Sequence, residues 1–249
     1  MNLFLLEAPE DSFESVYQNT PWAIVLQSIY DLLPIGLFLV GAVVLLRCLY
    51  NKMVKGNYAL LAAGSIMVFA AGFLKALHKF ILGVSGYNYL ILDKQFTPTQ
   101  SVGFALILVA FIGMFTSYNK KYTKVQAIAL PAILFTIFME TGNLPVFESS
   151  LPFIILMIVG AAGMLGMLIY IAIRRKDVMS AIFFGLAIIF MVMMGYLSTR
   201  NSWTMTWVAI SVNICYQALF MAGALRLQKK GLAAEDSLSR VAKEENKAE

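Results

Sequence analysis

Long apolar runs dominate the chain, and each is separated from the next by a short polar segment. A bilayer core of about 30 Å requires roughly 20 consecutive, mostly apolar residues in a helical span. The pattern predicts seven such spans, at 23–46, 58–82, 101–117, 125–139, 151–173, 178–197 and 203–225. The run at 125–139 is the shortest. The predicted fold class is therefore all-α, a polytopic membrane protein with seven transmembrane helices.

Composition agrees with this prediction and limits the number of domains. Hydrophobic residues make up 60% of the chain and charged residues 13%, whereas about a quarter of the residues of a soluble domain are charged. We divide the chain into an external acidic leader (1–22), a membrane domain (23–227) and a charged tail (228–249). The leader lacks the basic start and small-residue cleavage pattern of a signal peptide, so we expect it to be retained. No segment outside the membrane is long enough for a kinase or cyclase domain.

Basic residues follow alternate spans. They are Arg47, Lys52 and Lys55, then Lys120, Lys121 and Lys124, then Arg174, Arg175 and Lys176, and finally Arg226, Lys229 and Lys230. Short cytoplasmic loops are enriched in Lys and Arg, so this pattern predicts an external N-terminus and a cytoplasmic C-terminus. The net charge of +5 then reports topology and attraction to the lipid bilayer rather than nucleic-acid binding. The compact loops favour a bacterial inner membrane.

The segment 58–82 contains three ionisable residues, Lys75, His78 and Lys79, among apolar neighbours. An ionised side chain near the bilayer centre costs about 3 kcal/mol on insertion scales. Such residues persist when they are paired, hydrated or functional. The cluster is therefore the first place to look for a site.

Other polar residues occur in pairs four positions apart, which places both members on one helical face. The pairs are Gln27 with Asp31, Lys75 with Lys79, Thr136 with Glu140, and Asn213 with Gln217. At about 1.5 Å per residue, Asp31 and Lys75 lie in the same outer leaflet, roughly 13 and 10 Å below the outer ends of their spans. The sequence therefore predicts a ligand-binding set of Asp31, Lys75, His78, Lys79, Glu140, Asn213 and Gln217.

Structural interpretations compete with this functional one. Lys79 can extend to the outer interface without any function, and Asn213 and Gln217 can bridge helices. A lone histidine is more often a satisfied structural group than a proton switch, and Glu140 is close to water. Small residues at 160–163 and Gly166 predict a helix-packing seam rather than a site.

Several chemistries do not fit the sequence. One histidine and two separated cysteines cannot complete the usual zinc sites. The last span holds no lysine for a retinal Schiff base, and the chain has no glycine-rich phosphate loop and no GxSxG motif. We expect no cofactor and no metal, and no family resemblance is apparent.

Three functions remain open. The leading hypothesis is an outward-facing polar cavity that binds or transports a small, anionic solute, with Lys75 and Lys79 attracting the anion and Asp31 serving as the coupling residue or counter-ion. The second is a receptor or sensor that signals through a cytoplasmic protein partner. The third, ranked last, is an enzyme that acts on lipid head groups with His78 as base.

Overall fold

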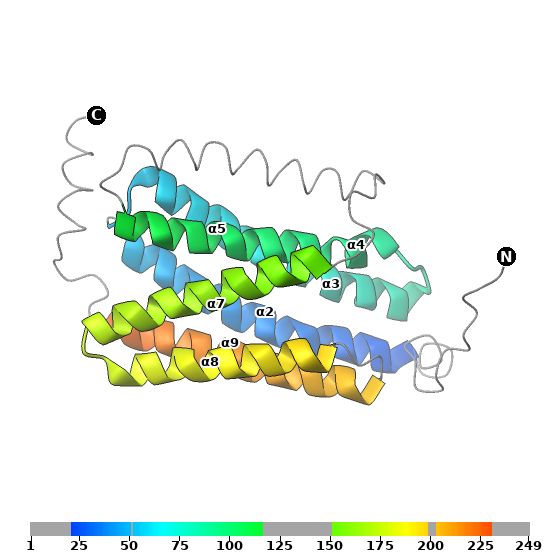
Figure 1. Cartoon of the computed structure of the whole chain (residues 1–249). Helices are drawn as coiled ribbons and strands as arrows, with labels where there is room; N and C mark the ends of the chain where they lie inside the picture. The colour runs from blue at the N-terminus through cyan, green and yellow to red at the C-terminus, as the bar shows by residue number, and fades with distance from the viewer. Residues whose placement is uncertain (1–20, 51, 117–150, 199–202, 231–249) are drawn as a thin grey trace.

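The computed structural model describes residues 21–50, 52–116, 151–198 and 203–230. Six helices in this part of the chain are long and apolar enough to cross a membrane, which makes the protein an integral, multi-pass membrane protein (Figure 1). The long helices are α2 (Pro21–Leu49), α3 (Lys55–Ser85), α5 (Phe96–Thr116), α7 (Leu151–Arg174), α8 (Val178–Ser198) and α9 (Trp203–Lys229), and a short helix α4 (Leu90–Lys94) precedes α5.

Six of the seven predicted spans are confirmed as helices. Their ends extend beyond the predicted apolar runs, most clearly in α5, which begins at Phe96 rather than at residue 101. The extra residues at these ends are mostly polar. They stay helical because the backbone hydrogen bonds of a helix do not require apolar side chains. The predicted span at 125–139 and the candidate residue Glu140 lie outside the described residues.

The six long helices pack as a closed ring in the order α2, α3, α5, α7, α8 and α9, with α9 returning to α2. The ring is flattened into two layers. Helices α5, α7 and α8 form one layer, and α3, α2 and α9 form the other (Figure 1). This arrangement turns one stripe of each long helix toward the interior. Helix α5 is the most enclosed of the six, since none of its residues 101–115 is exposed.

Two neighbouring pairs in the ring are parallel. Gly160 of α7 lies against the backbone of Phe104 in α5, and the rings of Phe115 and Tyr170 are 5.3 Å apart further along. Residue numbers therefore rise in the same direction on both helices. In the same way α2 runs parallel to α9. As a result, the end of α5 at Thr116 and the start of α7 lie at opposite ends of the bundle (Figure 1).

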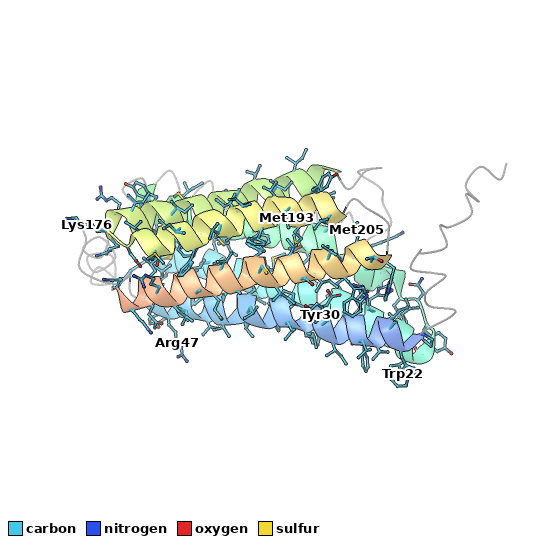
Figure 2. The ribbon with its side chains drawn as sticks, turned by 90° about the horizontal axis from the view of Figure 1, so that it is seen from below. Trp22, Tyr30, Arg47, Lys176, Met193 and Met205 are labelled. Carbon is cyan, nitrogen blue, oxygen red and sulfur yellow. The ribbon has the colours of Figure 1, made fainter. Side chains whose placement is uncertain are left out.

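The two ends of the bundle differ in chemistry. Arg47 and Lys176 lie at one end and Trp22 at the other (Figure 2). The helix order places all of the following described residues at the first end, which we call the basic end: Arg47, Lys52, Lys55, Arg174, Arg175, Lys176, Arg226, Lys229 and Lys230. The opposite end, which we call the aromatic end, carries exposed Trp22, Tyr87 and Tyr89. Aromatic side chains are typical of a membrane–water interface.

Aromatic side chains fill the middle of the ring. Phe38 of α2 stacks on Phe220 of α9 with ring centroids 5.8 Å apart, and it meets Phe104 of α5 edge-on at 6.2 Å. Phe184 of α8 lies 6.5 Å from Phe220. These four phenylalanines join both layers.

Glycines set the closest helix contacts. The predicted seam in α7 is confirmed at Gly160 and Gly163, which pack against α5, but Gly166 is exposed and has open space beside it. The closest approach is between α3 and α5, where Gly64 faces Gly103. Small residues at such points allow two membrane helices to bring their backbones together.

We predict that Gly64→Ala destabilises the protein and that Gly166→Ala does not. A Cβ atom at position 64 would lie 2.5 Å from the carbonyl oxygen of Gly103, whereas one at position 166 meets nothing within 4 Å. Relieving the clash requires α3 and α5 to separate, which should lower the free energy of unfolding by about 1–3 kcal/mol. Thermal unfolding of both variants in one detergent measures the difference. Equal melting temperatures would contradict the close approach of these helices.

Candidate functional site

A buried ion pair joins α2 and α3 in the half of the bundle nearer the aromatic end. The Nζ atom of Lys79 lies 2.6 Å from Oδ2 of Asp31, and the two side chains are only 9% and 15% exposed. Away from water, the attraction between such charges is much stronger than at a protein surface. The alternative that Lys79 extends to the interface is therefore wrong, because its ammonium group is held against the neighbouring helix.

Asp31 pairs with Lys79 rather than with Lys75, although both lysines belong to the predicted set. Side chains on a helix lean toward its N-terminus. Because α2 and α3 are antiparallel, Asp31 leans toward the aromatic end, and the α3 lysines lean away from it. Lys79, which starts one turn nearer the aromatic end than Lys75, therefore meets the carboxylate.

Lys75 lies beside this pair and faces α5. Its Nζ atom is 4.1 Å from the centre of the Phe96 ring, a cation–π contact at the first residue of α5. Lys75 is within electrostatic range of Lys79, Asp31 and Asp93. Asp93 is exposed on α4, so water screens its charge. Among the described residues, the cluster of Asp31, Lys75 and Lys79 thus carries one more cation than anion.

Helix α5 begins at the level of Lys75, where its first residue, Phe96, contacts the lysine. Helix α3 continues to Ser85 beyond the level at which Lys75 meets Phe96, a distance of about 15 Å. Helix α5 begins only at Phe96, and the short α4, packed on α3 and α5, occupies the chain just before it. Among the described residues, the lysine cluster therefore lies beside the long helices α2 and α3, and only the five-residue helix Leu90–Lys94 continues the chain beyond the start of α5.

Gln27 adds a second unusual feature on the same face of α2, one turn from Asp31. Its side chain is completely buried, and neither its amide nitrogen nor its amide oxygen has a hydrogen-bond partner within the described structure. The neighbouring Ser28, by contrast, donates its hydroxyl hydrogen to the carbonyl of Ala76 at 2.8 Å. A buried amide without partners costs about 1–3 kcal/mol, so it indicates a position that a ligand or water can satisfy.

His78 is buried and faces a different partner. Its Nε2 atom lies 3.0 Å from the amide oxygen of Asn88, which accepts the hydrogen bond. Ser85, a hydroxyl residue seven positions further along α3, donates its hydroxyl hydrogen to the carbonyl of Ile81 on its own helix. No hydrogen bond among the described residues links His78 to Ser85, so this geometry gives no support to a lipid-modifying site.

The α9 residues of the predicted set lie across α2 from α3. Contacts of α2 with both neighbours, Ile35 with Gly72 and Gly41 with Phe220, set Asn213 near the level of Lys75 and Gln217 one to two turns deeper. Tyr30 contacts Trp207, with rings 5.5 Å apart, and Gln217 follows ten residues later on the parallel helix, about 15 Å deeper. Gln217 is buried and its Oε1 has no partner in the described structure. Asn213 is half-buried. The structure therefore brings Asp31, Lys75 and Lys79 together, whereas His78 faces Asn88. Among the described residues, no hydrogen bond or ion pair joins Asn213 or Gln217 to the lysines.

A second buried acid, which sequence reasoning missed, lies at the basic end. Asp177 directly precedes α8 and is 2% exposed. Its Oδ2 accepts a hydrogen bond from Ser180 at 2.5 Å, and its Oδ1 accepts one from Nε of Arg226 at 2.9 Å. Burial raises the pKa of Asp177, but the Ser180 hydrogen bond and the Arg226 charge outweigh it and lower the pKa below its ordinary value.

Asp177 is presented by a tight helix end. Lys176 adopts a left-handed conformation with φ of 55°. The amide of Asp177 bonds to the carbonyl of Ala172, and that of Lys176 bonds to Ile173, which is the Schellman pattern of hydrogen bonds. The turn reverses the chain within three residues and places the acid between two helices. The sequence signal for this contact was a single acid directly after the three basic residues at 174–176.

Comparison with known proteins gives no further guide, since the chain matches no known family, no curated protein and no solved structure. Function is therefore inferred from the geometry of the site itself.

The Asp177 contact predicts how stability depends on pH. Because the folded-state pKa is lowered, the carboxylate contributes stability above the pKa of an unfolded aspartate, about 4, and that stability is lost as the pH falls through the folded value. Asp177→Asn should therefore lower the melting temperature at pH 7, and this difference from the wild type should shrink in acid. Asp93→Asn, at an exposed position, is the matched control. A difference that is constant throughout the acid range would contradict the assignment.

Proposed function

We propose that the protein binds a small oxyanion from the outer side of the membrane and carries it across. The observation that carries this proposal is the excess cation of the buried cluster: Lys79 is neutralised by Asp31, whereas Lys75 contacts an aromatic ring at 4.1 Å. The ammonium group of Lys75 lies among apolar helices, so it favours an anionic ligand, because two opposite charges can leave water together at a lower cost than either alone.

The class of anion follows from the available donors. Lys75 offers ammonium hydrogens, and Gln27 offers an amide group with no partner in the described structure. Several directional donors favour an anion with two or more oxygen atoms, such as a carboxylate, a sulfonate or an inorganic oxyanion. Among the described residues, the short helix α4 continues the chain beyond the start of α5 at the aromatic end. The aromatic end is therefore the simplest side for the anion to enter.

The proposal includes the topology of the chain. Thr116 and the start of α7 lie at opposite ends of the bundle. We therefore propose that the chain crosses the membrane between them, which adds one span to the six described and makes seven in total. The gathering of basic residues at one end supports a cytoplasmic basic end. The N-terminus is then external and the C-terminus cytoplasmic, with the lysine cluster in the outer leaflet of a bacterial inner membrane.

Anion binding can be measured on purified protein in lipid nanodiscs. We expect nitrate, methanesulfonate or sulfate to raise the melting temperature of the wild type and Lys75→Met to remove at least nine-tenths of the affinity, because the excess cation is lost. Lys94→Met, which removes an exposed lysine from α4, should bind as the wild type does. Uptake into proteoliposomes separates transport from binding alone.

Two results would contradict the proposal. One is the absence of a response to every oxyanion in the wild type. The other is an equal loss of affinity in the two lysine variants, which would indicate general attraction to the protein surface rather than a site at Lys75.

A further inference from the structure

We infer that oxyanion binding is coupled to protonation of Asp31, so that one proton enters the site with each anion. This inference rests on the proposed function and deepens it. Its basis is the contact between Asp31 and Lys79, which is buried, 2.6 Å long and located on the same face of α2 as Gln27.

The charge balance of the cluster supports this coupling. While Asp31 is ionised, it holds the Lys79 ammonium, and an anion at Lys75 lies near a second negative charge. When a proton from water adds to the carboxylate, Lys79 is released and both lysines can face the anion. One proton and one monovalent anion together leave the net charge of the site unchanged, and the proton frees the Lys79 ammonium, so that a second cation can offset the anion in this low-dielectric region.

The surroundings of Asp31 identify it as the proton acceptor. Lys75, His78 and Lys79 approach on α3, and Asp93 lies on α4 at the exposed surface. Near this level α9 contributes only neutral groups, Trp207 and Ser211, which contact Tyr30 of α2. His78 is the other candidate, but its Nε2 is engaged by Asn88. Asp31 is thus the one acid among the described residues that directly contacts a lysine of the cluster.

The neighbouring α2 backbone helps the carboxylate to change partner. Pro34 has no N–H group, so the carbonyl of Tyr30, beside Asp31, lacks its usual helical hydrogen bond. A protonated Asp31 is a hydrogen-bond donor, and this carbonyl and the unpartnered amide oxygen of Gln27 are acceptors on the same helix. Protonation therefore exchanges an ion pair for a hydrogen bond within α2.

The experiment measures protons and anions together. Wild-type protein in nanodiscs, in weakly buffered solution with a pH-sensitive dye, is mixed with sodium nitrate or sodium methanesulfonate, which do not themselves titrate near neutral pH. We expect the solution to become more alkaline by about one proton per bound anion and the affinity to fall roughly tenfold for each unit of rising pH. The matched variants are Asp31→Asn and His78→Gln.

The expected results separate the two residues. Asp31→Asn imitates the protonated acid, so it should bind the oxyanion with an affinity that is independent of pH and without proton uptake. His78→Gln should keep both the proton uptake and the pH dependence. If Asp31→Asn does not fold, the wild-type proton count and pH dependence, together with those of His78→Gln, still decide the question.

Each contrary result would overturn a different claim. Absence of oxyanion binding to the wild type at every pH would overturn the proposed function. Binding without proton uptake and without pH dependence would overturn the coupling while leaving the anion site intact. Unchanged proton uptake in Asp31→Asn, or its loss in His78→Gln, would overturn the assignment to Asp31.

Discussion

The contact between Asp31 and Lys79 is the interaction on which the half of the bundle nearer the aromatic end depends. Either charge alone would be expensive among the apolar side chains of α2 and α3, and a buried charge left without its partner costs about 3–5 kcal/mol in proteins. At 2.6 Å the pair fixes the register of these two helices. It also leaves Lys75 as the cation that the rest of the cluster does not neutralise.

The other polar contacts of the bundle contrast with this one. Asp177 and Arg226 join α8 to α9 at the basic end, where Arg226 is 42% exposed and water is near. That contact, with the Ser180 hydroxyl bonded to the same carboxylate, is fully satisfied. The lysine cluster combines a satisfied ion pair with the unpartnered amide of Gln27. This incomplete satisfaction supports the proposal that the cluster is a ligand site rather than a structural contact.

The sequence predicted the helices well because the membrane demands long apolar runs and places strict limits on charge. It also predicted that Asp31 and the α3 lysines share a leaflet, since depth follows from the rise per residue. It could not choose between Lys75 and Lys79, because that choice depends on the lean of side chains on antiparallel helices. The contact of Asp177 with Arg226 spans 49 positions and required the ring order of the helices.

Gln27 shows a further limit of sequence reasoning. Its spacing from Asp31 placed it on the right face of α2, yet only the packed bundle shows that both of its amide atoms are buried without partners. The predicted packing seam likewise failed at Gly166, because the ring turns that part of α7 outward. In both cases the helix face could be predicted, but the neighbour opposite that face could not.

The most direct test of the anion site is a crystal structure from a lipidic phase soaked in selenate, whose selenium atom gives an anomalous signal. We predict an anomalous peak in contact with the Lys75 and Lys79 ammonium groups, with Asp31 displaced from Lys79 and the Gln27 amide turned toward the anion. An intact Asp31–Lys79 pair with no peak between α2, α3 and α5 would contradict the account and make the cluster purely structural.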